Sequence, residues 1–287
     1  MKIAINEGYA RKVYGGKRRT AEEAMLLCKE AGFSVFDFGL GASTPEENII
    51  LRSSYLEDAK KTKDFCDKNE LEIEQTHARF DYDKIPADQF KPQMLRTVEA
   101  TKELGAGIVV IHGDCHWSDD FDTTLNSIYE SYAPMVELAE RLGVKIAVET
   151  LFDDKLPITN KRSRFTAAVE EVDALVAKFN SPAVGICWDM GHTAVAYENA
   201  QLDAVKRLRG KIIATHIHDN FYGKDLHLPP FFGNSDWSGI ISTLKDIGYG
   251  GAFTLELVYG CMPDDILMDY LKLNNKIAGY LVNEYNK

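Results

Sequence analysis

Short apolar runs, each followed by a segment with helical spacing, recur along the whole chain of 287 residues. Several of the runs are almost continuous Val and Ile, which is typical of parallel strands covered on both faces. The eight runs comprise residues 2–6, 34–40, 71–77, 107–113, 144–150, 183–189, 211–218 and 252–258. Strands that alternate with helices so regularly indicate the α/β class. Eight alternations predict a single (β/α)8 TIM barrel.

The segments between the runs carry the helical signals. After the fourth run, apolar side chains fall at helical spacing from Leu125 to Leu142, and Gly143 is placed to end that helix. Pro134 lies inside the pattern and should bend the helix. Residues 169–179 repeat the helical spacing. Because no low-complexity linker or shift in composition divides the chain, residues 1–287 are expected to form one barrel domain.

Polar side chains gather at the ends of the predicted strands. In a TIM barrel, the working residues lie at the carboxyl ends of the strands and in the loops that follow. The polar residues at those positions are His77, His112, Asp114, Glu149, Asp189, His192, His216, His218, Asp219 and Glu256. His227, in the loop after the seventh run, brings the count on this face to six of the seven histidines.

These carboxylates and imidazoles need partners, since burying them is costly unless they are paired or bind a metal. Taken singly, Glu149 could form a salt bridge, Asp189 could cap a helix, and Glu256 could pair with a loop lysine. Taken together on adjacent strands, they predict a divalent cation site. Because no cysteine falls at these ends, Mn²⁺, Mg²⁺, Co²⁺ or a catalytic Zn²⁺ fits better than a structural zinc.

Charge and cysteine content exclude several classes of partner. The net charge of −11 argues against binding to nucleic acid or to an anionic membrane. The five cysteines are odd in number and scattered, with no C-x-x-C pair, as expected for reduced thiols in a cytoplasmic protein. The opening residues lack the pattern of a leader peptide, and no apolar run is long enough to span a bilayer.

Four stretches resemble, in order and spacing, the xylose-isomerase-like barrels: "GVKIAVETL", "SPAVGICWDMGH", "HIHD" and "DWSGIISTLKDIGYGGAFTLEL". This superfamily contains sugar and sugar-phosphate isomerases and epimerases, inosose dehydratases and endonuclease IV. The most specific matches are D-x-G-H at residues 189–192 and L-E-L at residues 255–257. The resemblance covers essentially the whole chain and agrees with the fold that the alternating runs predict.

The resemblance implies that one divalent ion is held by Glu149, Asp189, His216 and Glu256. His216 is preferred to His218 because the family pattern H-x-x-D matches His216 and Asp219; His218 stands where many relatives carry Lys or Asn. In the family's sugar enzymes, a proton moves on the carbon beside a carbonyl and the metal stabilises the enediolate. The implied reaction is isomerisation or epimerisation of a keto sugar or related polyol.

The implied catalytic pair is Glu149 and Glu256, one on each side of the substrate. The expected substrate-binding residues are His77, His112, Trp117, His192 and His227. Dehydration, by β-elimination from a keto sugar or keto-cyclitol, shares the first proton abstraction and stays open. So does a phosphorylated substrate, for which Lys161, Arg162 and Arg164 could form a clamp. Assembly into a homo-oligomer is also left open.

Two further alternatives have less support. Endonuclease IV binds three zinc ions, and its ligand pattern maps onto His77, His112, Glu149, Asp189, His192, His216, Asp225, His227 and Glu256. A nuclease needs basic surroundings, however, and the loops "FDYDKIPADQF" and "DCHWSDDFD" are acidic. The chain also departs from the motifs at Arg79, where Pro is usual, and at Phe231, the first glycine position of G-x-G-x-x-D-W. A catalytically dead sugar-binding barrel would be expected to lack a ligand, and none is missing.

Overall fold

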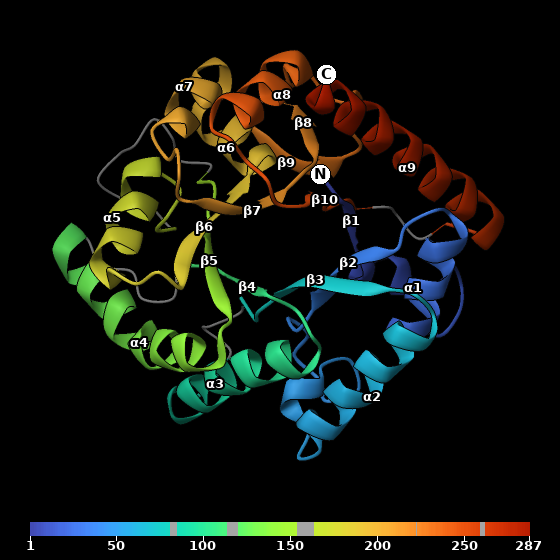
Figure 1. The fold of residues 1–287 in the computed structure, drawn as a ribbon, viewed down its shortest axis with the longest axis horizontal. Coiled ribbons are helices and arrows are strands. Elements are labelled where there is room, and N and C mark those ends of the chain that lie inside the picture. The colour runs from blue at the N-terminus through green and yellow to red at the C-terminus, as the bar shows by residue number, and fades with distance from the viewer. Residues whose placement is uncertain (81–84, 114–119, 154–163, 222, 259–261) are drawn as a thin grey trace.

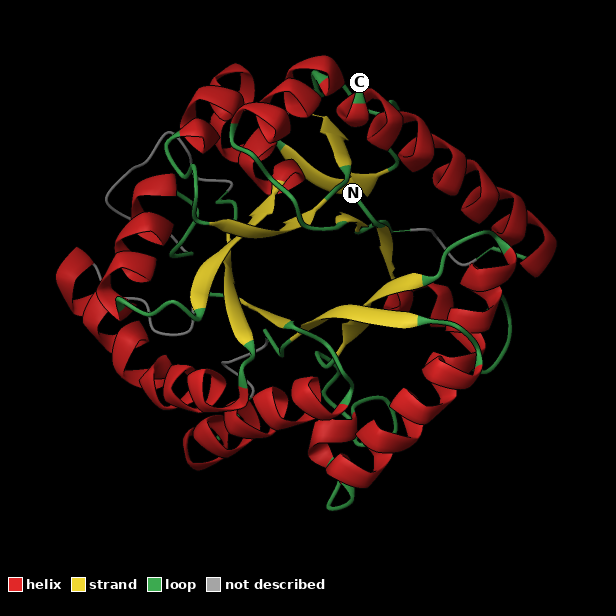
Figure 2. Cartoon of the chain, in the orientation of Figure 1, coloured by secondary structure: helices red, strands yellow, loops and turns green. Residues whose placement is uncertain are grey.

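The computed structural model describes all residues except 81–84, 114–119, 154–163, 222 and 259–261. Eight parallel strands form a barrel that helices surround, as the sequence predicts (Figure 1, Figure 2). The strands are β1 (Ile3–Asn6), β2 (Val35–Gly39), β3 (Glu72–His77), β4 (Ile108–Ile111), β5 (Lys145–Glu149), β6 (Val184–Asp189), β7 (Ile212–His216) and β10 (Phe253–Leu255). Each strand lies within the corresponding predicted run.

The barrel closes between its first and last strands. The order around the sheet is β10-β1-β2-β3-β4-β5-β6-β7, and Ile3 pairs with Phe253 in parallel. A parallel bridge between Ile217 and Leu255 joins the end of β7 to β10. The Ile217 amide donates to the Thr254 carbonyl at 2.8 Å, and the Glu256 amide donates to the Ile217 carbonyl at 3.1 Å. The carboxyl ends of all eight strands therefore open at one mouth.

The helices form the outer layer of the barrel (Figure 2). They are α1 (Ala21–Glu30), α2 (Tyr55–Lys68), α3 (Ala87–Glu103), α4 (Phe121–Leu142), α5 (Val169–Phe179), α6 (Met190–Tyr197), α7 (Gln201–Lys206), α8 (Trp237–Asp246) and α9 (Asp264–Asn286), with short 3-10 turns η1 (Glu7–Arg11), η2 (Ile49–Leu51) and η4 (Glu198–Ala200). Helix α4 runs through Pro134 and ends at Gly143, whose φ of 68° is the left-handed conformation that glycine favours.

A hairpin that is absent from the predicted runs crosses the mouth. Its strands are β8 (Asp219–Phe221) and β9 (Lys224–Leu228), paired antiparallel. Asp219 anchors the segment that follows, since its carboxylate accepts hydrogen bonds from the amides of Gly233 (3.0 Å) and Ser235 (3.2 Å) and from Trp237 Nε1 (3.0 Å). Asp219 thus has a structural role, and the hairpin carries Asp225 and His227 over the strand ends.

The core fills the space between strands and helices and the lower part of the barrel. Large side chains such as Trp188, Phe36 and Phe253 are fully buried between the sheet and the helices. Inside the barrel, Val110, Ala147, Cys187 and Ala214 pack together below the mouth. Apolar side chains therefore support the polar residues at the strand ends from beneath.

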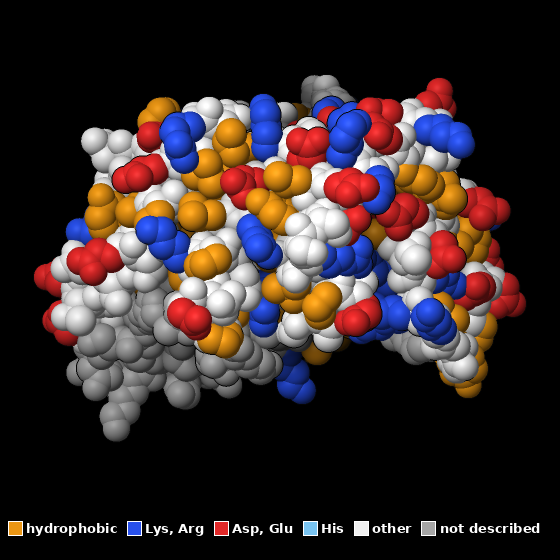
Figure 3. Space-filling view, turned by 90° about the horizontal axis from the view of Figure 1, so that it is seen from below, with side chains coloured by type: hydrophobic (Ala, Val, Ile, Leu, Met, Phe, Trp, Pro, Cys, Tyr) orange, Lys and Arg blue, Asp and Glu red, His pale blue; other side chains and the backbone are white. Residues whose placement is uncertain are grey.

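The outer surface mixes charges of both signs. On the side that Figure 3 shows, Lys and Arg alternate with Asp and Glu, and hydrophobic side chains are scattered between them. Within the described ranges, no helix is both long and apolar enough to cross a membrane.

Candidate active site

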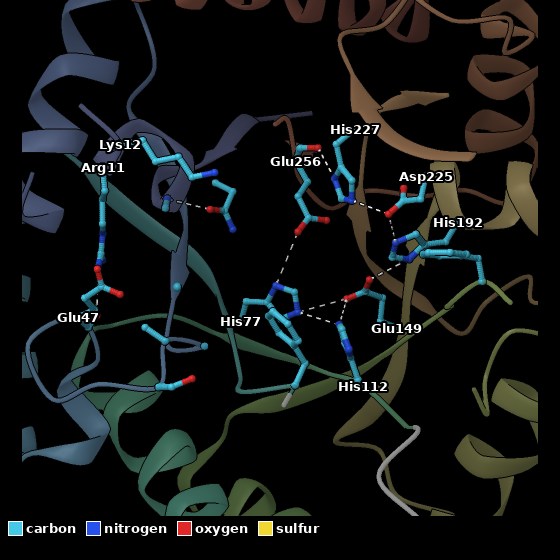
Figure 4. A pocket seen from close by; sticks show the side chains of 18 of the residues that line it. Arg11, Lys12, Glu47, His77, His112, Glu149, His192, Asp225, His227 and Glu256 are labelled. Carbon is cyan, nitrogen blue, oxygen red and sulfur yellow. Dashed lines mark hydrogen bonds and ion pairs between the residues drawn. The ribbon is translucent and has the colours of Figure 1, made fainter. Parts of the chain in front are cut away.

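A pocket of about 620 Å³ opens at the mouth of the barrel (Figure 4). Charged and histidine side chains line most of it. These are Arg11, Lys12, Arg18, Glu47, His77, His112, Glu149, Arg164, His192, Asp225, His227 and Glu256. The pocket thus lies where TIM barrels carry their active sites.

Glu149, Asp189, His216 and Glu256 form the centre of the site. Each of the four offers a ligand atom, and these atoms all lie within 4.8 Å of one another. His216 Nδ1 is 3.0 Å from Glu256 Oε2, 3.4 Å from Glu149 Oε2 and 3.8 Å from Asp189 Oδ2. The four residues end or follow β5, β6, β7 and β10, which are neighbours in the barrel. The structure therefore brings together the set that the sequence predicts.

The register of the paired strands explains why these side chains lie close together. In parallel pairs, Glu149 lies opposite Cys187, and Asp189 lies opposite His216. On the other side of the imidazole, His216 Nε2 is 3.1 Å from the Gln75 amide and 3.5 Å from Asp37 Oδ2. A carboxylate behind the imidazole is the usual support for a metal-binding histidine, and it leaves Nδ1 facing the cluster.

Three buried atoms of the central cluster form no well-aligned hydrogen bond and are held only by ion-pair contacts with one another and with neighbouring histidines. They are Glu149 Oε2, His216 Nδ1 and Glu256 Oε2. Leaving such groups unsatisfied costs about 1–3 kcal/mol each, and more when they are charged. All three point into the space shared by the cluster. Three carboxylates and one imidazole suit a divalent cation such as Mn²⁺, Co²⁺ or Zn²⁺, so these residues fit the ion that the sequence predicts.

The electrostatics keep the two glutamates ionised. Burial by itself would raise the pKa of Glu149, but neighbouring His112 and His216 hold it well below its usual range. The pKa of Glu256 is likewise lowered, because the attraction of His216 and His227 outweighs burial. Burial would lower the pKa of His216, but Cys187 and the two glutamates raise it well above its usual value. When no ion is bound, the protonated imidazole of His216 supplies the positive charge that balances the two glutamates.

His77 and His112 form a first flanking group, which contacts the central cluster through Glu149. His77 Nε2 is 3.4 Å and His112 Nε2 is 3.3 Å from Glu149 Oε2, and the two imidazole nitrogens are 3.2 Å apart. Phe80 stacks on His112 with ring centroids 5.2 Å apart. Burial lowers the pKa of His77, which favours the neutral imidazole that metal binding requires. Both histidines line the pocket, as expected for substrate-binding residues.

A second flanking group consists of His192 and His218 together with Asp225 and His227 of the hairpin. His227 Nε2 is 3.1 Å from Asp225 Oδ2, and His192 Nε2 is 3.7 Å from the same oxygen. His218 Nδ1 and Asp225 Oδ1 are 4.0 Å apart, and neither has a hydrogen-bond partner. On its other side, His218 Nε2 is 2.9 Å from Asp189 Oδ1. The structure thus gathers all nine residues of the multinuclear pattern into three adjoining groups.

The remaining expectations divide into two cases. Asp114, Trp117, Lys161 and Arg162 lie outside the described residues. Arg164 lines the pocket, with its guanidinium 4.7 Å from the centre of the Phe152 ring.

The opposite wall of the pocket carries residues that the sequence did not single out. Arg11, Lys12 and Arg18 line it from the β1 side. Arg11 is held by Glu7, which is fully buried, through two hydrogen bonds of 2.7 and 3.0 Å. The only sequence signal for Glu7 and Arg11 is their four-residue spacing directly after a strand.

Comparison with known sequences identifies the family. The family model described as xylose isomerase-like TIM barrel matches residues 25–272. An uncharacterized protein of Methanocaldococcus jannaschii is 29% identical over 227 residues, which cover 74% of each chain. An L-ribulose-5-phosphate 3-epimerase of Escherichia coli O1:K1 is 22% identical over 57% of this chain. That match spans 54% of the epimerase, about half of its length.

Solved structures share the fold along nearly the whole chain. A D-tagatose 3-epimerase-like protein is 23% identical, with a TM-score of 0.72 over 98% of this chain and 100% of its own. The IOLI protein, solved with a zinc atom, is 19% identical, with a TM-score of 0.75 over 99% of both chains. A probable 3-DHS dehydratase of Bacillus anthracis is 15% identical, with a TM-score of 0.71 over 96% of this chain and 98% of its own. At these identities the likeness shows the fold.

Proposed function

The chain belongs to the xylose isomerase-like TIM barrel family, and from this premise we propose that it is a divalent-metal-dependent isomerase or epimerase of a keto sugar or related polyol. One observation carries the proposal. Glu149, His216 and Glu256 turn unsatisfied, buried ligand atoms towards one point at the mouth of the barrel. Together with Asp189, these residues would hold the ion.

Glu149 and Glu256 have the properties of the proton-transferring pair. A bound ion would supply Lewis-acid stabilisation of the negative charge that develops on the substrate oxygens. One glutamate removes the proton from the carbon beside the carbonyl, and the other returns a proton to an adjacent position or to the opposite face. Because the pKa values of both are held below their usual range, either can act as the base at neutral pH, and the glutamate that returns a proton must first take one up from a substrate hydroxyl group or from solvent.

The proposed substrate is a small sugar. His77, His112, His192 and His227 line the pocket and would hydrogen-bond its hydroxyl groups, and Trp117 stays a proposed contact. Lys12, Arg18 and Arg164 on the walls can accommodate a negatively charged substituent. The E. coli relative is named for a phosphorylated ketose, so phosphorylated sugars belong among the candidates.

Elimination is a variant of the same chemistry. A dehydratase also begins by removing a proton beside a carbonyl, and the pocket residues serve that step equally well. A probable dehydratase is among the proteins that share this fold. The product separates the two reactions, since elimination yields an unsaturated ketone and isomerisation does not.

A multinuclear metal site of the endonuclease IV kind is the second candidate. The observation in its favour is that two further groups of potential ligands lie beside the central cluster. Within each group the ligand atoms are close enough to share an ion; the first contains His77, His112 and Glu149, and the second contains His192, Asp225 and His227. Against it stands the net charge of −11, because a nuclease needs a basic footprint around its site. The number of ions per chain distinguishes the two candidates.

Deuterium exchange tests the proposed chemistry. The metal-loaded protein is incubated in D₂O with phosphorylated and unphosphorylated ketoses, and NMR follows label at the carbon beside the carbonyl. Glu149→Gln and Glu256→Gln should each slow exchange on the order of 100-fold or more, whereas Glu57→Gln on the outside of α2 should not. Metal content is measured in every variant, because Gln is a poorer ligand. Normal exchange in either site variant would refute the assignment, and three zinc ions with cleavage of abasic DNA would favour the second candidate.

A further inference from the structure

Helix α9 presents a line of apolar side chains to solvent. Ile266, Leu273 and Tyr280 are 54%, 41% and 56% exposed. Their spacing of seven residues keeps them on one stripe of the helix, over a length of about 21 Å. The opposite face of α9 is buried against the barrel through Leu267, Leu271, Asn274, Ala278, Leu281 and Val282. Figure 1 shows α9 at the periphery, with its outer side uncovered by other elements in this view.

An aromatic patch extends this stripe at its C-terminal end. The ring of Phe231, which is 52% exposed, lies 6.1 Å from Tyr280 and 5.9 Å from Trp237. The three rings line a hollow of about 390 Å³ beside α8 and α9. The φ of Phe231 is 74°, a conformation that favours glycine, and the related motif has glycine at this position. The chain therefore keeps an exposed phenyl ring here at a conformational cost.

The charges beside the stripe are arranged in a self-complementary way. Asp269 and Lys276 are both exposed and lie on the same side of the stripe, and neither forms an ion pair within the described part of the chain. At 1.5 Å per residue, Asp269 lies about 6 Å before Leu273 and Lys276 about 4.5 Å after it. The helix dipole explains acidic residues in the first turn, but Asp269 and Lys276 lie beyond the terminal turns.

We propose that α9 is the interface of a homodimer, in which α9 of a second copy packs antiparallel across Leu273. A twofold axis at Leu273 sets Asp269 of each copy beside Lys276 of the other. The same axis sets Ile266 of each copy opposite Tyr280, next to the aromatic hollow. Twofold interfaces are built from one patch that complements itself, and both the apolar stripe and the charges meet that condition.

Helix α2, which belongs to the same outer layer, shows no such arrangement among its described residues, and this contrast supports a specific role for α9. Helix α2 exposes Leu56 (44%), but the exposed neighbours on that helix are paired within the chain, as Lys60 is with Asp64. The surface in Figure 3 shows mixed charges with scattered apolar side chains. Leu56 and Asp64 therefore provide matched controls for Leu273 and Asp269.

Sedimentation velocity and light scattering on the full chain test the interface. The wild-type protein and Leu56→Glu are expected to form dimers, whereas Leu273→Glu is expected to be monomeric with an unchanged circular dichroism spectrum and melting temperature. Asp269→Lys and Lys276→Asp each place like charges together twice in a dimer and should weaken association about tenfold or more, while Asp64→Lys should not.

Mixing the two charge variants gives the decisive measurement. In a heterodimer of Asp269→Lys with Lys276→Asp, both cross-interface contacts become attractive again, so the mixture should associate as the wild-type protein does. Wild-type protein that is monomeric at every soluble concentration would overturn the proposal. So would dimers that survive Leu273→Glu, or a mixture that associates no better than its components.

Discussion

Gly191→Ala should damage the site although it adds a single methyl group. A Cβ at this position, in the first turn of α6, would lie 1.9 Å from Cε1 and 2.2 Å from Nδ1 of His218. The His218 ring has little room to retreat, because it stacks on His227 with centroids 3.9 Å apart. Its Nε2 also lies 2.9 Å from Asp189 Oδ1. Accommodating the methyl group must therefore displace His218 from Asp189.

The effect of Gly191→Ala on the free energy of unfolding can be estimated by adding three contributions. Forcing a methyl group into a packed site costs about 1–3 kcal/mol. Losing a hydrogen bond to a charged group costs about 1.5–3 kcal/mol. Alanine recovers about 1 kcal/mol relative to glycine within a helix. The net destabilisation should be about 1.5–5 kcal/mol. Because Asp189 loses its support, affinity for a divalent ion should also fall about 10- to 100-fold.

Urea unfolding of chelator-treated protein measures the first effect, and calorimetric titration with Mn²⁺ or Zn²⁺ measures the second. Gly279→Ala in α9 is the matched control, since no atom lies within 4 Å of its added Cβ. That control should be neutral or more stable by up to about 1 kcal/mol, with unchanged ion affinity. An unfolding free energy and an ion affinity for Gly191→Ala that equal those of the wild type would refute the reasoning.

Two further outcomes are expected. Arg11→Leu leaves Glu7 buried without its cation and should lower the free energy of unfolding by about 3–5 kcal/mol in urea, and adding Glu7→Gln should restore part of it. In metal-free protein, burial opposes protonation of His227, but Asp225 raises its pKa to about 9. The stabilisation by the protonated His227 is complete below about pH 6.5, which is the pKa of a histidine in the unfolded chain, and it is lost as the pH rises towards 9. The melting temperature should therefore fall between these two pH values. Asp225→Asn should flatten the decline; an equally steep one would contradict the explanation.

The strands, and the gathering of polar residues at one mouth, could be predicted from local signals in the sequence, whereas the choice of four ligands among those residues came from the resemblance to the family. A buried parallel strand needs a continuous apolar run, and each of the eight runs contains a strand. Polar residues at the ends of runs then meet because the fold places those ends around one mouth. Glu149, Asp189, His216 and Glu256 all follow this rule.

Residues whose role depends on distant partners could not be predicted in this way. Asp37 and Gln75 lie inside strands, and their relevance comes from His216, which is 141 residues from Gln75 along the chain. The hairpin β8–β9 is short and polar, so it lacks the apolar alternation of a strand. Its geometry depends on the contacts of Asp219 with the loop after it, which only the folded chain reveals.

Closure of the barrel by its first and last strands has a consequence for the order of folding. Ile3 cannot pair until Phe253 is available, so the contact that completes the sheet links the most distant parts of the chain. Such non-local pairing is slow to form, and during synthesis it must wait until nearly the whole polypeptide has left the ribosome. Glu256 directly follows the closing strand. Acquisition of the full set of ion ligands should thus be among the last events of folding, and the appearance of tight ion binding would time the closure of the barrel.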